Sequence, residues 1–203
     1  MKEPYNKNEL RDIIISVAAL TLIFALPHTY LLPFAFVAVI VGFLFHELSH
    51  RYIAKKFDAV AYFQMWPQGL LFGLILSFIS GFSFKAAAPG AVVVHPYRYS
   101  RWKYRSVHLT VNEWGWIAAA GPITNIIAAI IFAAIGFATT GLLSLGANFI
   151  FGVNAILGAF NLIPFGPLDG AKVARWKVWF WVFLFIISVA LTVFSYKYLQ
   201  IIY

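Results

Sequence analysis

The chain has 203 residues, of which 62% are hydrophobic and 11% charged, and its formal net charge is +8. A soluble domain carries about 25% charged residues, so this composition excludes an ordinary soluble enzyme and indicates a multi-spanning membrane protein. The chain contains no cysteine, which excludes thiolate metal ligands, a cysteine nucleophile and a disulfide framework.

Six apolar runs follow one another along the chain, and a helix of about 20 such residues crosses about 30 Å of hydrocarbon. Pro67, Gly69, Gly73 and Gly81 interrupt the third run, which therefore predicts a re-entrant or interfacial excursion. We expect one transmembrane domain over 1–203: an all-α polytopic fold with five to six transmembrane helices, a re-entrant segment and a short β-hairpin-like element. The runs are 13–32, 31–54, 66–84, 114–137, 142–163 and 178–196, and the expected core is 31–177.

The second run contains the sequence His46-Glu47-Leu48-Ser49-His50. On a helix the two imidazoles are four positions apart, so they point the same way and can bind one metal ion. This is the H-E-x-x-H pattern of zinc hydrolases, in which the glutamate is the general base for a metal-bound water. Ionisable groups in an apolar segment are costly, so this cluster predicts a functional metal site.

A third ligand is expected, because catalytic zinc usually takes three protein ligands. The chain has seven acidic residues, and Asp169 differs from the others by its surroundings. Pro164, Gly166, Pro167 and Gly170 break the helix at the end of an apolar run. Irregular backbone at membrane depth is tolerated where it lines a cavity or is buried in protein. The pattern therefore predicts Asp169 as the third ligand of one zinc ion.

A strand-like segment, Ala91-Val92-Val93-Val94, follows the Pro89-Gly90 turn signal. Such a strand could accept an extended substrate by β-augmentation, and a purely structural hairpin is the alternative. The basic and aromatic segment 95–105 has the composition of a single-stranded nucleic-acid site, but its position between two membrane elements favours contact with lipid headgroups. We therefore expect the lipid bilayer as a partner, and no nucleic acid.

The order of the runs predicts a topology. The histidine pair and Asp169 both lie near the ends of apolar runs, so they meet only if an even number of crossings separates them. One of the three intervening runs must then fail to cross, and 66–84 is the weakest. In that arrangement fourteen lysines and arginines, Lys85 among them, share one face and Lys197 alone lies opposite. The positive-inside rule then predicts five full crossings and a metal site on the cytoplasmic side of the cell membrane.

Three motifs in this order, His46-Glu-Leu-Ser-His50, Gly121-Pro-Ile-Thr-Asn125 and the segment 161–170, resemble those of the site-2 protease family of intramembrane zinc metalloproteases. The resemblance covers roughly 43–173. It implies that His46, His50 and Asp169 bind zinc, that Glu47 is the catalytic base and that Asn161 holds the substrate or the oxyanion. It also implies transmembrane protein substrates. The chain departs from the family at Ala171, where a second glycine is common, and in having no PDZ-like or CBS-like domain.

Alternative interpretations remain for several of these residues. The same His and Asp ligands would serve a metal-binding transporter or channel, although such a protein needs no base at Glu47. In membrane proteases of the CAAX type a downstream glutamate binds the metal, and Glu113 is the candidate here. The Asn125 and Asn161 amides could instead tie spans together, and for Asn125 that structural reading is favoured.

Overall fold

The computed structural model describes residues 7–82, 85, 89–95, 97–100, 103–106 and 108–202. Most of the described chain is helical, and two short turns, η1 (Thr29–Leu31) and η2 (Ile40–Leu44), lie between the first three helices. The described residues form four strands: β1 (Val60–Met65), β2 (Gly90–His95), β3 (Tyr97–Ser100) and β4 (Lys103–Ser106). The helices are α1 (Glu9–Ala25), α2 (Leu32–Val39), α3 (Phe45–Lys56), α4 (Pro67–Ile79), α5 (Val111–Ala138), α6 (Gly141–Asn161), α7 (Asp169–Trp176) and α8 (Val178–Ile202).

Four helical segments of the described chain are long and apolar enough to cross a membrane: Thr29–Lys56, Val111–Ala138, Gly141–Asn161 and Val178–Lys197. These segments indicate a membrane protein, and they correspond to four of the six apolar runs. The other two runs form shorter helices. Helix α1 has 17 residues, and α4 has 13, about 20 Å at 1.5 Å per residue, which is less than a full crossing. The count of five to six spans and the re-entrant path stay predictions.

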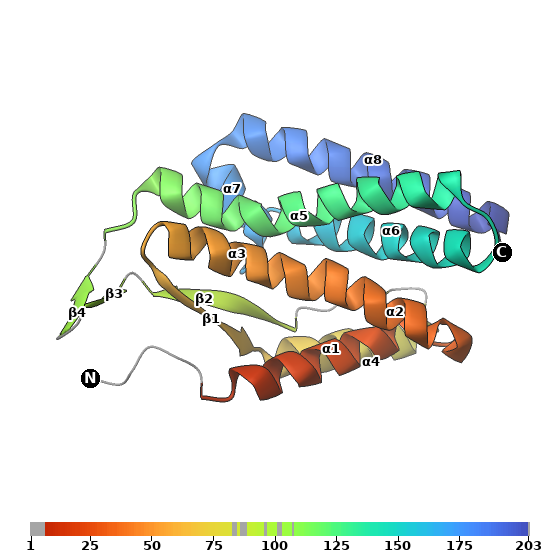
Figure 1. Cartoon of the computed structure of the whole chain (residues 1–203), viewed down its shortest axis with the longest axis horizontal. Helices are drawn as coiled ribbons and strands as arrows, with labels where there is room; N and C mark the ends of the chain where they lie inside the picture. Colours follow the sequence, from red (N-terminus) through yellow and green to blue (C-terminus); the bar gives the residue numbers. More distant parts are fainter. Residues whose placement is uncertain are drawn as a thin grey trace.

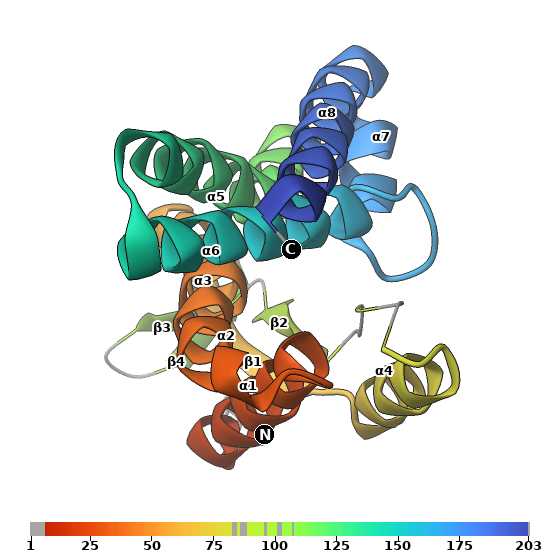
Figure 2. The same ribbon diagram turned by 90° about the vertical axis from the view of Figure 1, so that its right-hand side faces the viewer.

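Helices α5, α6 and α8 form a layer on one side of the long α2–α3 helix, while α1, α4 and the β1–β2 sheet lie on the other side (Figures 1 and 2). Apolar side chains from several helices fill the space between the layers, among them Phe24 of α1, Val39 of α2 and Val153 of α6. A second cluster, including Ala119 and Val173, joins α5 to α7 and α8. The segment that carries the histidines is therefore held in the middle of the fold.

Strands β1 and β2 pair in antiparallel fashion, with Phe63 opposite Val92. The expected strand at 91–94 is present, and α4 with the segment after it connects β1 to β2, so these two strands do not form a hairpin. The sequence did not predict β1. A second ribbon pairs β3 with β4, within the segment expected to meet lipid headgroups; Pro96, Arg101 and Trp102 of that segment lie outside the described residues.

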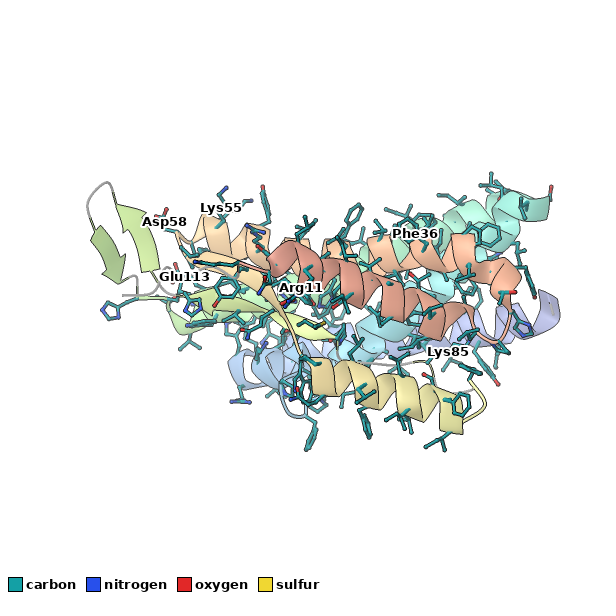
Figure 3. All side chains as sticks on the ribbon, turned by 90° about the horizontal axis from the view of Figure 1, so that it is seen from below. Arg11, Phe36, Lys55, Asp58, Lys85 and Glu113 are labelled. Atoms are coloured by element: carbon teal, nitrogen blue, oxygen red, sulfur yellow. The ribbon has the colours of Figure 1, made fainter. Side chains whose placement is uncertain are left out.

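Lys85 lies at an unexpected end of the molecule. Its Nζ donates a hydrogen bond to the carbonyl oxygen of Phe24 at 3.0 Å, in the last turn of α1. Figure 3 shows Lys85 at the end opposite Lys55 and Glu113. The expectation that Lys85 shares a face with the other basic residues is wrong, because its ammonium group satisfies a free carbonyl at the helix C-terminus. Burial lowers the pKa of this lysine.

Candidate metal centre

His46, His50 and Asp169 converge at one point. Both histidines lie on α3, one turn apart, and Asp169 is the first residue of α7. The two Nε2 atoms are 3.0 Å apart, and Asp169 Oδ2 lies 3.0 Å from His50 Nε2 and 3.2 Å from His46 Nε2. All three side chains are buried. The structure thus brings together the three predicted ligands, although 119 positions separate His50 from Asp169.

The other nitrogen of each imidazole faces an oxygen atom. His50 Nδ1 lies 2.6 Å from the carbonyl oxygen of Ile117, and His46 Nδ1 lies 2.6 Å from Asn125 Oδ1. A carbonyl oxygen can only accept, so His50 carries a proton on Nδ1, and the neutral ring then presents a lone pair at Nε2. That lone pair faces the carboxylate oxygen of Asp169, an arrangement that is repulsive unless a cation lies between them.

Gly121 of α5 forms a wall of this group. A Cβ atom at this position would overlap the Nε2 atoms of both His46 and His50. The backbone of α5 can therefore approach the imidazoles only where the side chain is a hydrogen. Ligands of a tetrahedral zinc ion are about 3.3 Å apart for metal–ligand bonds of 2.0–2.1 Å. The donor set and its spacing fit a divalent metal ion, and zinc prefers such ligands.

The connection between α6 and α7 places Asp169. Gly166 adopts a positive φ of 59° in this loop, which glycine tolerates without strain. A Cβ on Gly170 would overlap the carbonyl oxygen of Leu162, so this glycine lets α7 start directly against the end of α6. Lys172 Nζ donates to the second carboxylate oxygen of Asp169 at 3.2 Å. This ammonium group favours the ionised form of Asp169, which burial opposes.

Glu47 lies beside this group and is also buried. Its Oε2 accepts a hydrogen bond from the backbone amide of Val92 at 3.0 Å. The predicted base and the predicted substrate strand are therefore in direct contact, as the position of β2 beneath α3 in Figure 1 leads one to expect.

A cavity of about 720 Å³ joins these features. Its lining includes the three candidate ligands, Glu47, the whole of Ala91–Val94, Asn161 and Lys172. Every residue that the sequence proposed for the site thus reaches one cavity. Asn161, however, donates through Nδ2 to Leu157 O of its own helix at 3.0 Å, and within the described residues no hydrogen bond joins it to the histidines or Asp169.

Sequence reasoning assigned no role at the metal group to Lys172 or Asn125, and it used Gly121 only as part of a motif that carries the family resemblance. The spacing of Gly121 and Asn125, four residues apart on one helix, was the available signal, since it puts both on the same face of α5. Glu113, the alternative metal ligand, accepts instead from the Thr110 amide at 2.6 Å and hydroxyl at 2.8 Å. This exposed capping box argues against the CAAX-type arrangement.

The fold and this group define a helical membrane protein with a buried His-His-Asp group that could hold a metal ion, next to a glutamate. Comparison with known proteins adds the family. The chain is 38% identical over 181 residues to MJ0611 of Methanocaldococcus jannaschii, covering 87% of this chain and 88% of the relative. It is 29% identical over 165 residues to YwhC of Bacillus subtilis, covering 70% and 68%.

Both relatives carry the name "Putative zinc metalloprotease". The chain belongs to this zinc metalloprotease family. No family model matches the chain, and no solved structure matches it.

Proposed function

We propose that the protein is an intramembrane zinc metalloprotease of the site-2 protease type, which hydrolyses peptide bonds in or near transmembrane segments of membrane proteins. The observation that carries the proposal is the meeting, in one cavity, of the buried His46, His50 and Asp169 group with Glu47 and the edge of β2. A binding site for metal alone has no need of a carboxylate and a strand edge beside it.

The chemistry requires a nucleophile and a proton carrier. When bound by His46, His50 and Asp169, one zinc ion would lower the pKa of a water molecule and polarise the scissile carbonyl. Glu47 takes the proton from the water as its oxygen bonds to the carbonyl carbon. The same carboxyl group then delivers the proton to the leaving nitrogen as the carbon–nitrogen bond breaks. The cavity position of Glu47 gives it access to both atoms.

The orientation of β2 supports substrate binding along its edge. The Phe63 amide donates to Glu9 Oε1 at 2.8 Å and so points away from β2. In an antiparallel pair, residues directly opposite each other either bond to one another or both point away. Val92 is opposite Phe63, so its amide and carbonyl face the cavity, as the hydrogen bond to Glu47 independently indicates.

The other edge of the sheet is occupied by α1. Glu9 accepts the amide of Phe63, and Asp12 accepts the amide of Met65 at 3.4 Å. An added strand would therefore pair with β2, through the outward-facing backbone of Val92 and Val94. A transmembrane substrate must unwind before it can pair in this way, because a helix uses its own backbone groups. A bound substrate strand would accept the hydrogen bond that the Val92 amide otherwise donates to Glu47.

The charges around the site suit a cytoplasmic orientation in the cell membrane. Arg51, Lys55 and Lys56 lie on the helix of the histidines, and Lys172 and Arg175 lie on the helix of Asp169. Basic residues concentrate on the cytoplasmic side of membrane proteins. The active site is therefore proposed to face that side.

Cleavage of a model transmembrane protein by the purified protein in detergent tests the proposal. We expect cleavage that a chelator stops and added zinc restores, and that Glu47→Gln abolishes while zinc stays bound. The matched variant Glu113→Gln, which removes an exposed carboxylate away from the metal group, should cleave normally. A Glu47→Gln protein as active as the wild type would contradict the mechanism. Zinc transport that survives Glu47→Gln, without any cleavage by the wild type, would favour the transporter.

A further inference from the structure

We propose that Asn125 is a positioning residue: its side-chain amide holds His46 in the tautomer that carries the proton on Nδ1, and so leaves Nε2 free to bind metal. The inference concerns metal binding alone. It would therefore stand even if the protein bound zinc and cleaved no peptide.

The orientation of the Asn125 side-chain amide follows from the backbone carbonyl of Gly42, and that of its neighbour Asn154 from the backbone carbonyl of Ile150. Its Nδ2 lies 2.7 Å from the carbonyl oxygen of Gly42 and 3.3 Å from Asn154 Oδ1. The Gly42 oxygen can only accept, so the NH2 end of Asn125 must face it. Asn154 is oriented in the same manner, because its Nδ2 donates to the carbonyl oxygen of Ile150 at 2.8 Å. Its own oxygen is thus left to accept from Asn125.

With its NH2 end committed, Asn125 presents Oδ1 to His46. The 2.6 Å contact with His46 Nδ1 then requires a proton on that nitrogen, since an amide oxygen cannot donate. Both asparagines have 0% relative exposure, so water does not compete for these groups. The chain of hydrogen bonds, donated from His46 to Asn125 and from Asn125 to Asn154, therefore has one consistent arrangement of protons.

Local backbone structure makes this network possible. Gly42 belongs to the π-helical turn η2, in which the Phe45 amide bonds to the carbonyl of Ile40, five residues back. Turns of this kind interrupt the regular helical ladder. Gly42 also lacks a side chain where α6 approaches, and a Cβ there would come within 3.2 Å of Asn154 Oδ1. Helices α5 and α6 can therefore both reach the start of the histidine helix.

The alternative tautomer of His46, with its proton on Nε2, shows why the hydrogen bond from His46 to Asn125 affects metal binding. If His46 were protonated on Nε2, that group could donate to Asp169 Oδ2, which is 3.2 Å away. The hydrogen bond would stabilise the metal-free site and occupy the lone pair that the metal needs. Asn125 opposes this tautomer, because its Oδ1 accepts a hydrogen bond from Nδ1 and so stabilises the ring that is protonated there. Outer partners of this kind typically change metal affinity 10–100-fold.

Nitrogen NMR of the chelator-treated protein, labelled with ¹⁵N-histidine, tests the proposal without any activity measurement. The chain has five histidines, and single replacements assign their signals. In the wild type we expect both His46 and His50 to carry the proton on Nδ1. Detection of His46 with its proton on Nε2 in the metal-free wild type would overturn the proposal without any variant.

Variants extend the test. Asn125→Leu should move the His46 proton to Nε2, leave His50 unchanged because Ile117 holds it, and weaken zinc binding at least tenfold in chelator competition. Asn125→Asp keeps the accepting oxygen and should retain the Nδ1 tautomer. Asn148→Leu is the matched control. Asn148 lies on α6 and is fully buried, as Asn125 is on α5, but its side chain donates a hydrogen bond to Ser144. A purely structural role predicts the wild-type tautomer in every folded variant, and that result would refute the proposal.

Discussion

Replacement of Gly121 by alanine separates metal binding from folding. The added Cβ would overlap the Nε2 atoms of both His46 and His50, although nonbonded carbon contacts normally begin near 3.5 Å. The rings must then shift by about 1 Å, whereas metal sites tolerate deviations of about 0.2 Å. The rings cannot shift freely, because their Nδ1 atoms are held at 2.6 Å. Helix propensity alone favours alanine over glycine by about 1 kcal/mol. We therefore expect a folded protein that has lost zinc.

The assay combines zinc content per purified chain with thermal unfolding in the presence and absence of chelator. Zinc at a hundredfold excess over its dissociation constant stabilises a protein by about 2.7 kcal/mol, so chelator should lower the unfolding temperature of the wild type. It should leave that of Gly121→Ala unchanged. Gly146→Ala is the control, because its Cβ would make a similarly tight contact, 2.6 Å from the Phe34 ring, away from the metal group. Normal zinc affinity in Gly121→Ala would refute the reasoning.

Two further substitutions address the substrate strand and the aspartate. Val92→Pro removes the N–H group that donates to Glu47 and leaves the β1–β2 ladder intact, because this N–H group faces away from β1. Cleavage of a transmembrane substrate should fall at least tenfold at unchanged zinc content. The control variant Val92→Ala should cleave normally. Equal activity of the proline and alanine variants would argue against strand addition. Lys172→Met removes the donor to Asp169 Oδ1, and chelator competition should show zinc affinity reduced by about tenfold at most, because the lysine is half exposed. Lys172→Arg should restore the affinity for zinc. A Lys172→Met protein with wild-type affinity would exclude a role of Lys172 in holding Asp169 for the metal.

Local spacing accounts for the predictions that the structure matches most closely. The i, i+4 separation of His46 and His50 fixes their common direction on any α-helix, since 3.6 residues make a turn. The break at Pro164 and Pro167 similarly ends α6 and begins α7, and thereby marks Asp169 as unusual. Long apolar runs predicted four segments that the structure shows as helices of spanning length. These features depend on neighbours in the chain.

Contacts between distant segments required the tertiary structure. The sequence suggested that Asn125 ties helices together, and it does so through its hydrogen bonds to Gly42 and Asn154. Its oxygen also contacts His46, because α5 packs against α3 with this face of the helix turned toward the histidines. Lys85 was placed with the wrong group of charges, since nothing local indicates that its segment returns to the end of α1.

The sequence by itself determined the composition of the membrane helices, the paired histidines and the broken segment around Asp169. Only the tertiary structure decided that these groups meet within 3.2 Å, that Val92 contacts Glu47 and which residues hold the imidazoles. Spacing along one helix follows from backbone geometry. Distances between α3, α5 and α7 depend instead on how side chains, and the glycines that replace them, allow whole helices to pack.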